Sequence, residues 1–574
     1  MSFISTALSP QSRREALDQM AAGELDVLVI GGGVVGAGAA LDAASRGLKV
    51  GLVEARDYAS GTSSRSSKLV HGGLRYLKQL NFRLVFEALR ERSLILDTLA
   101  PHLARPVEFI YPLERRFIDR AWVGTGVGVY DILGAGRGVP SHLRHLGKKK
   151  TLEYFPGGKK GGIHGGIKFY EGQLDDARHT MMLSRTAASY GALCANSARV
   201  TGFLRNGDSV IGVHVKDLET GRELDIKAKQ VINAAGVWTD EIQKMTGGKR
   251  NFRVTASKGV HVLVDRHKIP SKTGLITETE KSLLFIIPCP WNDDFWIIGT
   301  TDTAWDLDLA HPAASRGDID YILDQANRLL EVKLTRDDVV GVYAGLRPLL
   351  AGESDETSKL SREHAVVSPV PGLVIVAGGK YTTYRVMAKD AVDLAVKSLP
   401  GKVGKSITAT VPVIGAEGYT PLKNNVDKIA AETRMTSLRV THLLSRYGSG
   451  IKEIVALINE RPELGEEVEH AEKYLKAEMV YAVSHEGALH LDDILARRTR
   501  VSIDTPDRGV ACAPAVAALV APLLGWDEAA IANEIEHYNA RVEAERESQI
   551  QIDDQTADAA RLGAPEVRVG AAGS

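Results

Sequence analysis

The sequence predicts an α/β fold in three parts: a discontinuous α/β domain, an antiparallel β-rich domain inserted into it, and a C-terminal helical domain. Short apolar β runs followed by glycine occur near residues 30, 236 and 378, which indicates one sheet assembled from distant pieces. Strand patterns such as GVHVLV, SLLFIIP and FWIIGTT fall within residues 245–345 and predict the inserted domain. From Lys423 onward the apolar residues follow a helical period.

The composition is that of an ordinary soluble protein. The 574 residues suggest roughly two to four domains; hydrophobic residues make up 44% and charged residues 25%, and the net charge is −1. Nucleic-acid-binding proteins usually carry a basic footprint, so that class is disfavoured. Cys194, Cys289 and Cys512 are far apart and lack metal spacing, which favours a reducing compartment.

No segment of the sequence predicts a membrane span. The first residues contain no apolar core of signal-peptide length, and residues 11–20 indicate a short amphipathic helix. A run of about 18 apolar residues is also lacking. A contact with the membrane surface stays open.

A glycine motif follows the first predicted strand. Asp26–Ile30 is an apolar β run, and Gly31, Gly33 and Gly36 follow it as G-x-G-x-x-G. A helix and a second strand come next, and that strand ends in Glu54. Strand, glycine turn, helix, strand and acid within about 30 residues are typical of a Rossmann-type dinucleotide-binding unit.

Each part of this unit has a chemical reason. Gly31 allows the tight turn, Gly33 lets the backbone approach a pyrophosphate, and Gly36 allows helix and strand to pack closely. The helix N-terminus offers N–H groups to phosphates, and Glu54 accepts hydrogen bonds from ribose hydroxyls. NAD and FAD share this fingerprint. The discontinuous sheet favours FAD, because a simple NAD domain would be complete within about 150 residues.

Several longer motifs carry a resemblance to a known family. The chain resembles the FAD-dependent, quinone-linked glycerol-3-phosphate dehydrogenases, within the flavin oxidoreductase group that includes D-amino-acid oxidase. The likeness covers about residues 25–390 and is weaker at ILARRTR, 494–500. Where the family often has leucine, this chain has Tyr381. The motifs are VIGGGVVGAG at 29–38, TSSRSSKLVHGGLRYL at 62–77, LDDAR at 174–178, INAAGVW at 232–238, SKGVHVLV at 257–264, IIGTTDT at 297–303, AGLRPL at 344–349 and GGKYTTYR at 378–385.

The resemblance implies a reaction and a location. It implies oxidation of sn-glycerol 3-phosphate to dihydroxyacetone phosphate by hydride transfer to FAD, with a membrane quinone receiving the electrons. It also implies a homodimer in the cytoplasm, bound peripherally to the inner face of the cell membrane. Three alternatives stay open: the same oxidation with oxygen as acceptor and hydrogen peroxide as product, an amino-acid oxidase of the same fold, and a non-catalytic flavin-binding protein.

The resemblance also implies a substrate site, which must hold a phosphate dianion and remove a hydroxyl proton. The family's substrate-binding cations correspond to Arg75, Arg347, Arg362 and Lys380, and arginine forks suit phosphate. His71 and His261 are the candidate bases, and His261 also lies in the substrate motif. Arg347 is a third catalytic candidate, because it could stabilise the developing alkoxide instead.

The stretch TSSRSSKLVHGGLRY at 62–76 is expected to contact the cofactor first and the substrate last. Backbone at His71 and the glycines after it would pass close to the flavin. No metal site is expected, since AGESDET at 351–357 lacks EF-hand spacing. The predicted FAD-binding residues are Gly31, Gly33, Gly36, Glu54, Thr62, Ser63, Ser64, Ser67, Lys68, Leu69, His71, Gly236, Gly379 and Thr382.

The predicted boundaries follow these motifs. Residues 1–24 form an N-terminal arm; residues 25–91, 171–244 and 346–400 form the FAD-binding pieces; residues 92–170 and 245–345 form the cap and substrate pieces; residues 420–550 form the helical domain; and residues 551–574 form a disordered tail. Within 92–170 we expect loops and helices. Arg115, Arg116, Arg120, Trp122 and Lys148–Lys150 are candidates for membrane docking, although a solvated charged face is the simpler interpretation.

Overall fold

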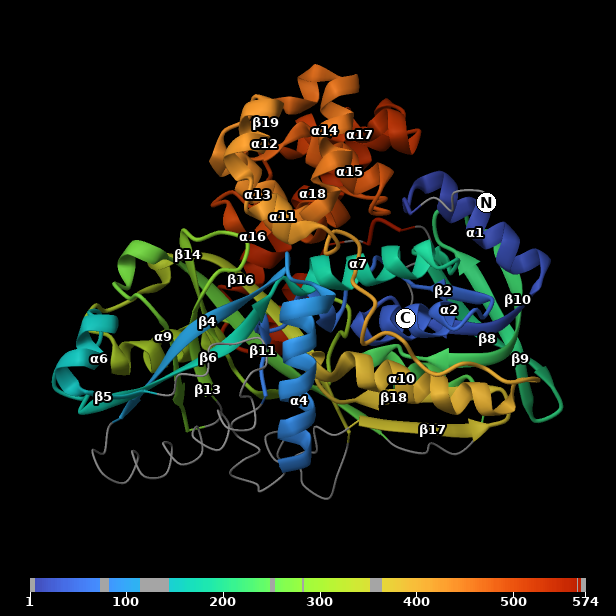
Figure 1. The fold of residues 1–574 in the computed structure, drawn as a ribbon, viewed down its shortest axis with the longest axis horizontal. Helices are drawn as coiled ribbons and strands as arrows, with labels where there is room; N and C mark the ends of the chain where they lie inside the picture. The colour runs from blue at the N-terminus through green and yellow to red at the C-terminus, as the bar shows by residue number, and fades with distance from the viewer. Residues whose placement is uncertain are drawn as a thin grey trace.

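The computed structural model describes residues 6–72, 82–113, 144–247, 253–280, 283–350, 364–564 and 566–568. Figure 1 shows two sheets side by side, with the C-terminal helices, in orange and red, lying over both. This arrangement confirms the predicted fold class of a Rossmann-type α/β domain, a β-rich second domain and a helical C-terminal domain.

The first sheet is built from distant parts of the chain, as predicted. Its strands are β1 (Glu24–Ile30), β2 (Val50–Val53), β7 (Leu193–Ala195), β8 (Ala198–Asn206), β9 (Ser209–Asp217), β10 (Glu223–Asn233), β17 (His364–Val370) and β18 (Leu373–Gly378). The order is β17-β18-β10-β1-β2-β7, with β9 also paired to β10 and β8 paired to β9. The strands from β18 to β7 in this order run parallel, so their carboxyl ends share one edge of the sheet.

Helices cover both faces of this sheet. One face packs against α2 (Val34–Ser45), α7 (Asp176–Ser189) and α10 (Tyr384–Ala395), and the other packs against α1 (Pro10–Ala22). Along β1 the side chains alternate, so Val27 and Val29 face α2 while Leu28 and Ile30 lie in the cluster that includes α1. Helix α1 matches the predicted N-terminal helix. A sheet covered on both faces explains the continuous apolar runs in the sequence.

The second sheet has the order β15-β11-β14-β13-β12-β4-β6-β3, with β16 on β11 and β5 on β6. Its pairs are antiparallel except for β12 with β4. Helix α9 (Arg316–Leu329) packs against this sheet. The strands are β3 (Leu69–Val70), β4 (Ala104–Leu113), β5 (Arg144–Gly147), β6 (Gly165–Leu174), β11 (Val254–Asp265), β12 (Gly274–Glu278), β13 (Leu283–Pro288), β14 (Phe295–Gly299), β15 (Thr303–Trp305) and β16 (Val339–Leu350).

The expectation of loops and helices for residues 92–170 was wrong in part, because β4, β5 and β6 belong to the second sheet. Proline and glycine hid these strands in the sequence. Pro106 pairs with Gly172, and Pro112 pairs with Gly166, so residues that usually interrupt strands face each other across the ladder. Further helices are α4 (Phe82–Leu94), α6 (Lys148–Tyr154) and α8 (Thr239–Lys244).

The C-terminal region is helical, as predicted. Its helices are α11 (Tyr419–Lys423), α12 (Val426–Thr433), α13 (Ser437–Tyr447), α14 (Ile451–Glu460), α15 (Lys476–Ser484), the π-helix η11 (Asp493–Arg498), α16 (Val501–Asp504), α17 (Ala513–Leu524), α18 (Glu528–Ser548) and α19 (Asp554–Leu562). A small hairpin joins β19 (Glu467–Val468) to β20 (Ala471–Leu475). Within the described ranges no helix is both long and apolar enough to cross a membrane.

The prediction of a disordered tail was wrong for the described part of residues 551–574. Helix α19 begins after a capping Asp553, and its Ala557 is buried beside Trp305. Near the end of the chain, Arg568 is buried and pairs with Asp493. The tail is poor in large apolar residues, so its composition resembles disorder, but buried ion pairs and one small apolar contact hold it.

Candidate active site

A cavity of about 670 Å³ is lined by residues from both sheets. It lies at the edge where the parallel strands of the first sheet end, which is where open α/β sheets usually bind ligands. Many of the predicted site residues line it although they are far apart in the sequence. They are Gly31, Gly33, Glu54, Thr62, Ser63, Ser67, Leu69, His71, Gly236, His261, Arg347, Gly379, Lys380 and Thr382.

Other predicted site residues do not line this cavity. Gly36 packs against the turn, since a Cβ there would collide with the carbonyl oxygen of Gly31. Ser64 and Lys68 are buried, and the Lys68 ammonium donates to the Ser64 carbonyl and the Asp176 carboxylate. Arg75 and Arg362 lie outside the described residues.

The glycine turn leaves space that a side chain would fill. Gly31 has φ +109°, and a Cβ there would lie 2.8 Å from the carbonyl oxygen of Ala234, which directly follows the neighbouring strand β10. Gly33 is the N-cap residue of α2, and the N–H of Val34 donates to Ser63 Oγ at 2.9 Å. The open helix N-terminus and the bare backbone form a cradle suited to a pyrophosphate.

Glu54 stands at the end of β2 beside this cradle. Its carboxylate accepts hydrogen bonds from the backbone N–H of Gly32 at 2.6 Å and of Arg56 at 2.8 Å. Burial raises the pKa of Glu54, and these two N–H donors oppose that shift. The carboxylate is therefore held in one orientation at the cavity wall, as a ribose-binding acid requires.

The segment Thr62–His71 connects the two sheets along the cavity. Thr62 Oγ1 donates to the carbonyl of Leu346, and the N–H of His71 donates to Thr382 Oγ1 at 3.1 Å. Between them, Lys68 adopts a left-handed conformation with φ 59°. The segment is therefore tied at one end to Leu346 of β16 and at the other end to Thr382, which follows β18.

Both candidate bases, His261 and His71, line the large cavity. His261 is buried, stacks on Tyr343 at 4.8 Å between ring centroids, and shares a 2.9 Å hydrogen bond between its Nε2 and Ser67 Oγ. Burial first, and then the charges of Arg347 and Lys68, hold the pKa of His261 well below its ordinary value. A neutral imidazole is available to accept a proton at neutral pH.

Two glycines that sequence reasoning missed make room for the catalytic candidates. A Cβ on Gly259 would lie 2.5 Å from Arg347 Nη2, and a Cβ on Gly299 would collide with the His261 ring. The Arg347 guanidinium donates to Thr300 Oγ1 and to the Thr301 carbonyl, both at 3.1 Å. The glycines in SKGVHVLV and IIGTTDT were the available signal, because glycine inside a strand often marks a close approach.

The C-terminal region reaches the back of the Thr62–His71 segment. Asp176 accepts hydrogen bonds from Ser66, through both its N–H and Oγ, and from Lys68. Arg500 Nη2 donates to Asp176 at 3.0 Å and to Asp175 at 2.8 Å. A charge from the C-terminal region therefore compensates the acids that fix the segment. Nothing in the sequence links these residues, which are 324 positions apart.

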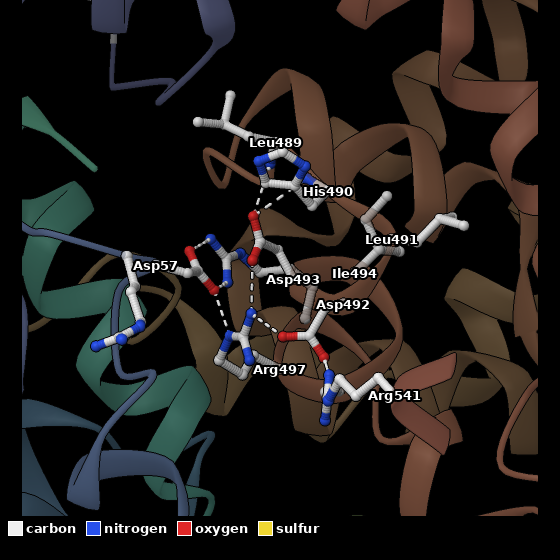
Figure 2. Close-up of polar contacts among 12 residues, drawn as sticks. Asp57, Leu489, His490, Leu491, Asp492, Asp493, Ile494, Arg497 and Arg541 are labelled. Carbon is white, nitrogen blue, oxygen red and sulfur yellow. Dashed lines mark hydrogen bonds and ion pairs between the residues drawn. The ribbon is translucent and has the colours of Figure 1, made fainter. Parts of the chain in front are cut away.

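Figure 2 shows a second ion-pair network at the same junction, where Asp57 meets η11. Asp57 accepts from Arg497 Nε and from Arg498 Nη2, and Arg497 Nη2 also pairs with Asp492 and Asp493. Asp57 follows Glu54 by three positions, so the loop after β2 is anchored by the ILARRTR motif.

Comparisons with known proteins show the family of the chain. The family described as FAD dependent oxidoreductase matches residues 26–394, and the C-terminal domain of alpha-glycerophosphate oxidase matches residues 406–531. A glycerol-3-phosphate dehydrogenase of Mycobacterium leprae is 56% identical over 563 residues, which is 98% of this chain and 96% of that protein. The human mitochondrial glycerol-3-phosphate dehydrogenase is 35% identical, over 90% of this chain and 73% of that protein.

A solved structure gives the same result. The glycerol-3-phosphate dehydrogenase from Bacillus halodurans, complexed with FAD, has a TM-score of 0.78 and 30% identity, covering 93% of this chain and 98% of that one. Fold, cavity and matches together define a member of the FAD-dependent oxidoreductases. Within them, the chain belongs to the glycerol-3-phosphate dehydrogenase family. The predicted cofactor, FAD, is confirmed, and the glycine cradle, Glu54 and the cavity of about 670 Å³ fit it.

Proposed function

We propose that the protein oxidises sn-glycerol 3-phosphate to dihydroxyacetone phosphate with FAD as the hydride acceptor. The observation that carries this proposal is the placement of Arg347, Lys380 and the neutral His261 on the wall of the cavity that also holds the glycine cradle. Cations for a phosphate, a proton acceptor and a dinucleotide cradle are what the reaction needs. The names of the relatives point to the same substrate.

The proposed cofactor contacts follow the cavity wall. Glu54 binds the ribose hydroxyls, the turn of Gly31 and Gly33 at the start of α2 holds the pyrophosphate, and the segment Thr62–His71 lies along the flavin. Gly236, Gly379 and Thr382 complete the contact from the neighbouring strand ends. When bound, FAD supplies a flavin ring that accepts a hydride.

The proposed substrate contacts come from the second sheet and from the turn after β18. Arg347 and Lys380 bind the phosphate, and His261 accepts the proton of the C2 hydroxyl. The hydrogen bond to Ser67 and the stack on Tyr343 orient the His261 ring. His71 remains the second candidate base, and Arg347 could also stabilise the alkoxide. Arg75 and Arg362 stay predictions.

We further propose a quinone as the electron acceptor, peripheral contact with the cytoplasmic face of the membrane, and a homodimer. These follow from the resemblance. Lys148, Lys149 and Lys150 are exposed at the start of α6 and could contact anionic lipid headgroups. Arg115, Arg116, Arg120 and Trp122 lie outside the described residues.

Anaerobic reduction of the bound flavin tests the proposed reaction. Glycerol 3-phosphate added to the holoenzyme without oxygen is expected to bleach the visible flavin absorbance, whereas glycine and D-alanine leave it unchanged. Bleaching by an amino acid would favour the oxidase alternative. If no substrate bleaches the flavin while dithionite does, the proposed dehydrogenase activity is wrong.

A separate assay tests the electron acceptor. Under air, with a soluble quinone present, turnover is expected to reduce quinone with little hydrogen peroxide. Peroxide formed in equal amount to dihydroxyacetone phosphate without quinone would instead identify oxygen as the acceptor.

A further inference from the structure

A second, smaller cavity lies where the C-terminal region meets the Thr62–His71 segment. Its volume is about 80 Å³, and Arg65 lines both this cavity and the large one. Four further arginines from the C-terminal region line it: Arg497, Arg500, Arg541 and Arg561. The acidic side chain in its wall is Glu545. We call this space the junction cavity.

Two of these arginines are compensated by acids elsewhere in the junction. Arg497 pairs with Asp57 and Asp493, and Arg500 pairs with Asp175 and Asp176. The Nε atom of Arg500 is nonetheless buried and makes no hydrogen bond to the residues that the structure describes. Arg500 therefore keeps one donor unused although its side chain is almost wholly buried.

The remaining arginines share too little negative charge. Glu545 accepts from Arg508 at 3.3 Å, from Arg541 at 3.2 Å and from Arg561 at 3.0 Å, so one carboxylate serves three guanidinium groups. Arg541 has a second partner in Asp492, which Arg497 also uses (Figure 2). The Nε atom of Arg541 is a buried donor without a hydrogen bond among the described residues.

Arg65 has the least compensation of the set. It donates to the carbonyl of Ala310 at 3.2 Å, and among the described residues it pairs with no carboxylate. Burial first, and then the charges of Arg541, Arg497 and Arg561, lower the pKa of Arg65 to about 9. Burying like charges together is costly unless an anion lies between them.

We propose that the junction cavity binds a phosphate group, either inorganic phosphate or the phosphate of a small phosphomonoester. Guanidinium forks match the oxygens of a tetrahedral dianion, and the unused Nε donors of Arg500 and Arg541 are suited to it. The cavity has room for such a group, because its volume of about 80 Å³ is several times the roughly 10–15 Å³ that one water needs. The site is independent of which substrate the large cavity takes.

The occupant would act on the active-site segment from behind. The two residues after Arg65 are Ser66 and Ser67. Ser66 is hydrogen-bonded to Asp176, and Ser67 is hydrogen-bonded to His261. A phosphate group held by Arg65 would therefore stabilise this segment in the conformation seen here.

Thermal unfolding of the holoenzyme tests the proposal. The unfolding midpoint is measured with increasing inorganic phosphate at constant ionic strength, with chloride as the balancing salt, and calorimetric titration counts the sites. Phosphate is expected to raise the midpoint because it binds the folded state. The Arg347→Ala variant, in which the proposed substrate site is damaged, is expected to keep one phosphate site, the junction cavity. This variant therefore separates the inference from the proposed function.

Glycerol 2-phosphate added to the same variant shows whether an ester is accepted.

Two substitutions locate the site. Arg561→Gln is expected to weaken phosphate binding in the Arg347→Ala background at least tenfold, whereas Arg328→Gln, at an exposed arginine, leaves it unchanged. Gln549→Glu adds a carboxylate to the cavity wall beside Arg508, so it is expected to raise the midpoint and remove the response to phosphate. Gln555→Glu, an exposed control in α19, does neither.

The outcome that overturns the proposal is equally specific. The junction cavity is excluded as a phosphate site if the Arg347→Ala variant binds no phosphate. It is also excluded if phosphate binding to that variant is unchanged by both Arg561→Gln and Gln549→Glu. The Gln549→Glu arm keeps the test valid if Arg561→Gln fails to fold.

Discussion

At the scale of single residues, paired choices on neighbouring strands shape the proposed site. Gly259 makes room for the Arg347 guanidinium, and Gly299 makes room for the His261 ring. In each pair, the functional side chain fills the space beside a glycine on the adjacent strand. The position of Arg347 and of His261 therefore depends on a neighbour that has no side chain. Alanine at either glycine would push the functional group out of place.

Arg347→Ala is expected to lower kcat/KM for glycerol 3-phosphate on the order of 10³-fold while FAD stays bound. Two charge-assisted hydrogen bonds to a phosphate or alkoxide are worth roughly 3–6 kcal/mol together. Steady-state kinetics and the flavin spectrum of the purified variant measure both effects. Turnover within about threefold of the unchanged protein would remove Arg347 from the site.

Glu54→Gln is expected to weaken FAD retention rather than substrate binding. The substitution keeps the shape but removes the charge that is proposed to accept hydrogen bonds from ribose, so the dissociation constant for FAD should rise roughly tenfold to a hundredfold. Fluorescence titration of the apoprotein with FAD measures it. If the KM for glycerol 3-phosphate rises more than the dissociation constant for FAD, the assignment of Glu54 to the cofactor is contradicted.

At the scale of secondary-structure elements, contacts within one short motif could be predicted from the sequence, whereas contacts between distant parts of the chain could not. The glycine turn, Glu54 and the strand-end glycines form contiguous motifs whose spacing carries their geometry, and they line one cavity as expected. Lys68 is different, because a left-handed residue inside a polar run gives no signal that its side chain turns to Asp176. The partnership of Arg500 with Asp176 spans the molecule, so no local pattern could reveal it.

The contact between Arg500 and the acids of α7 gives a prediction for these elements. Arg500→Met is expected to destabilise the protein by about 3–5 kcal/mol, because it removes a buried cation that pairs with both Asp175 and Asp176. Arg500→Lys, which keeps the charge, should recover part of this loss. Denaturant unfolding of the holoenzyme measures the free energy of unfolding. Equal stability of the methionine and lysine variants would contradict an ionic role.

At the scale of the whole molecule, His490 connects the C-terminal region to the first domain. Its Nε2 bonds Glu219 at 3.1 Å and its Nδ1 bonds Glu534 at 2.7 Å. Burial and the charge of Arg568 lower the pKa of His490, but the two glutamates outweigh them and raise it to about 10. The protonated form is thus favoured in the folded state.

This shift predicts a pH dependence of stability. A group whose pKa rises on folding contributes stability that is complete below its unfolded value, near 6.5, and is lost as the pH rises toward about 10. The free energy of unfolding should therefore fall by at most about 1.4 kcal/mol per pH unit across this window. Urea unfolding at several pH values, compared with His490→Gln, isolates the contribution. Parallel pH profiles for the two proteins would contradict it.

The bond from Arg500 to Asp176 also fixes an order of events during synthesis. The two residues are separated by 324 positions. At about 5–20 residues per second, the ribosome needs roughly 15–65 s to make the intervening chain. Throughout that interval the nascent chain carries its glycine cradle and the Lys68–Asp176 pair, but Asp175 and Asp176 lack the second cation, Arg500. Translation that stops before residue 500 therefore releases a product that contains most of the proposed active-site residues but lacks the Arg500 contact behind the segment that carries Ser66 and Lys68.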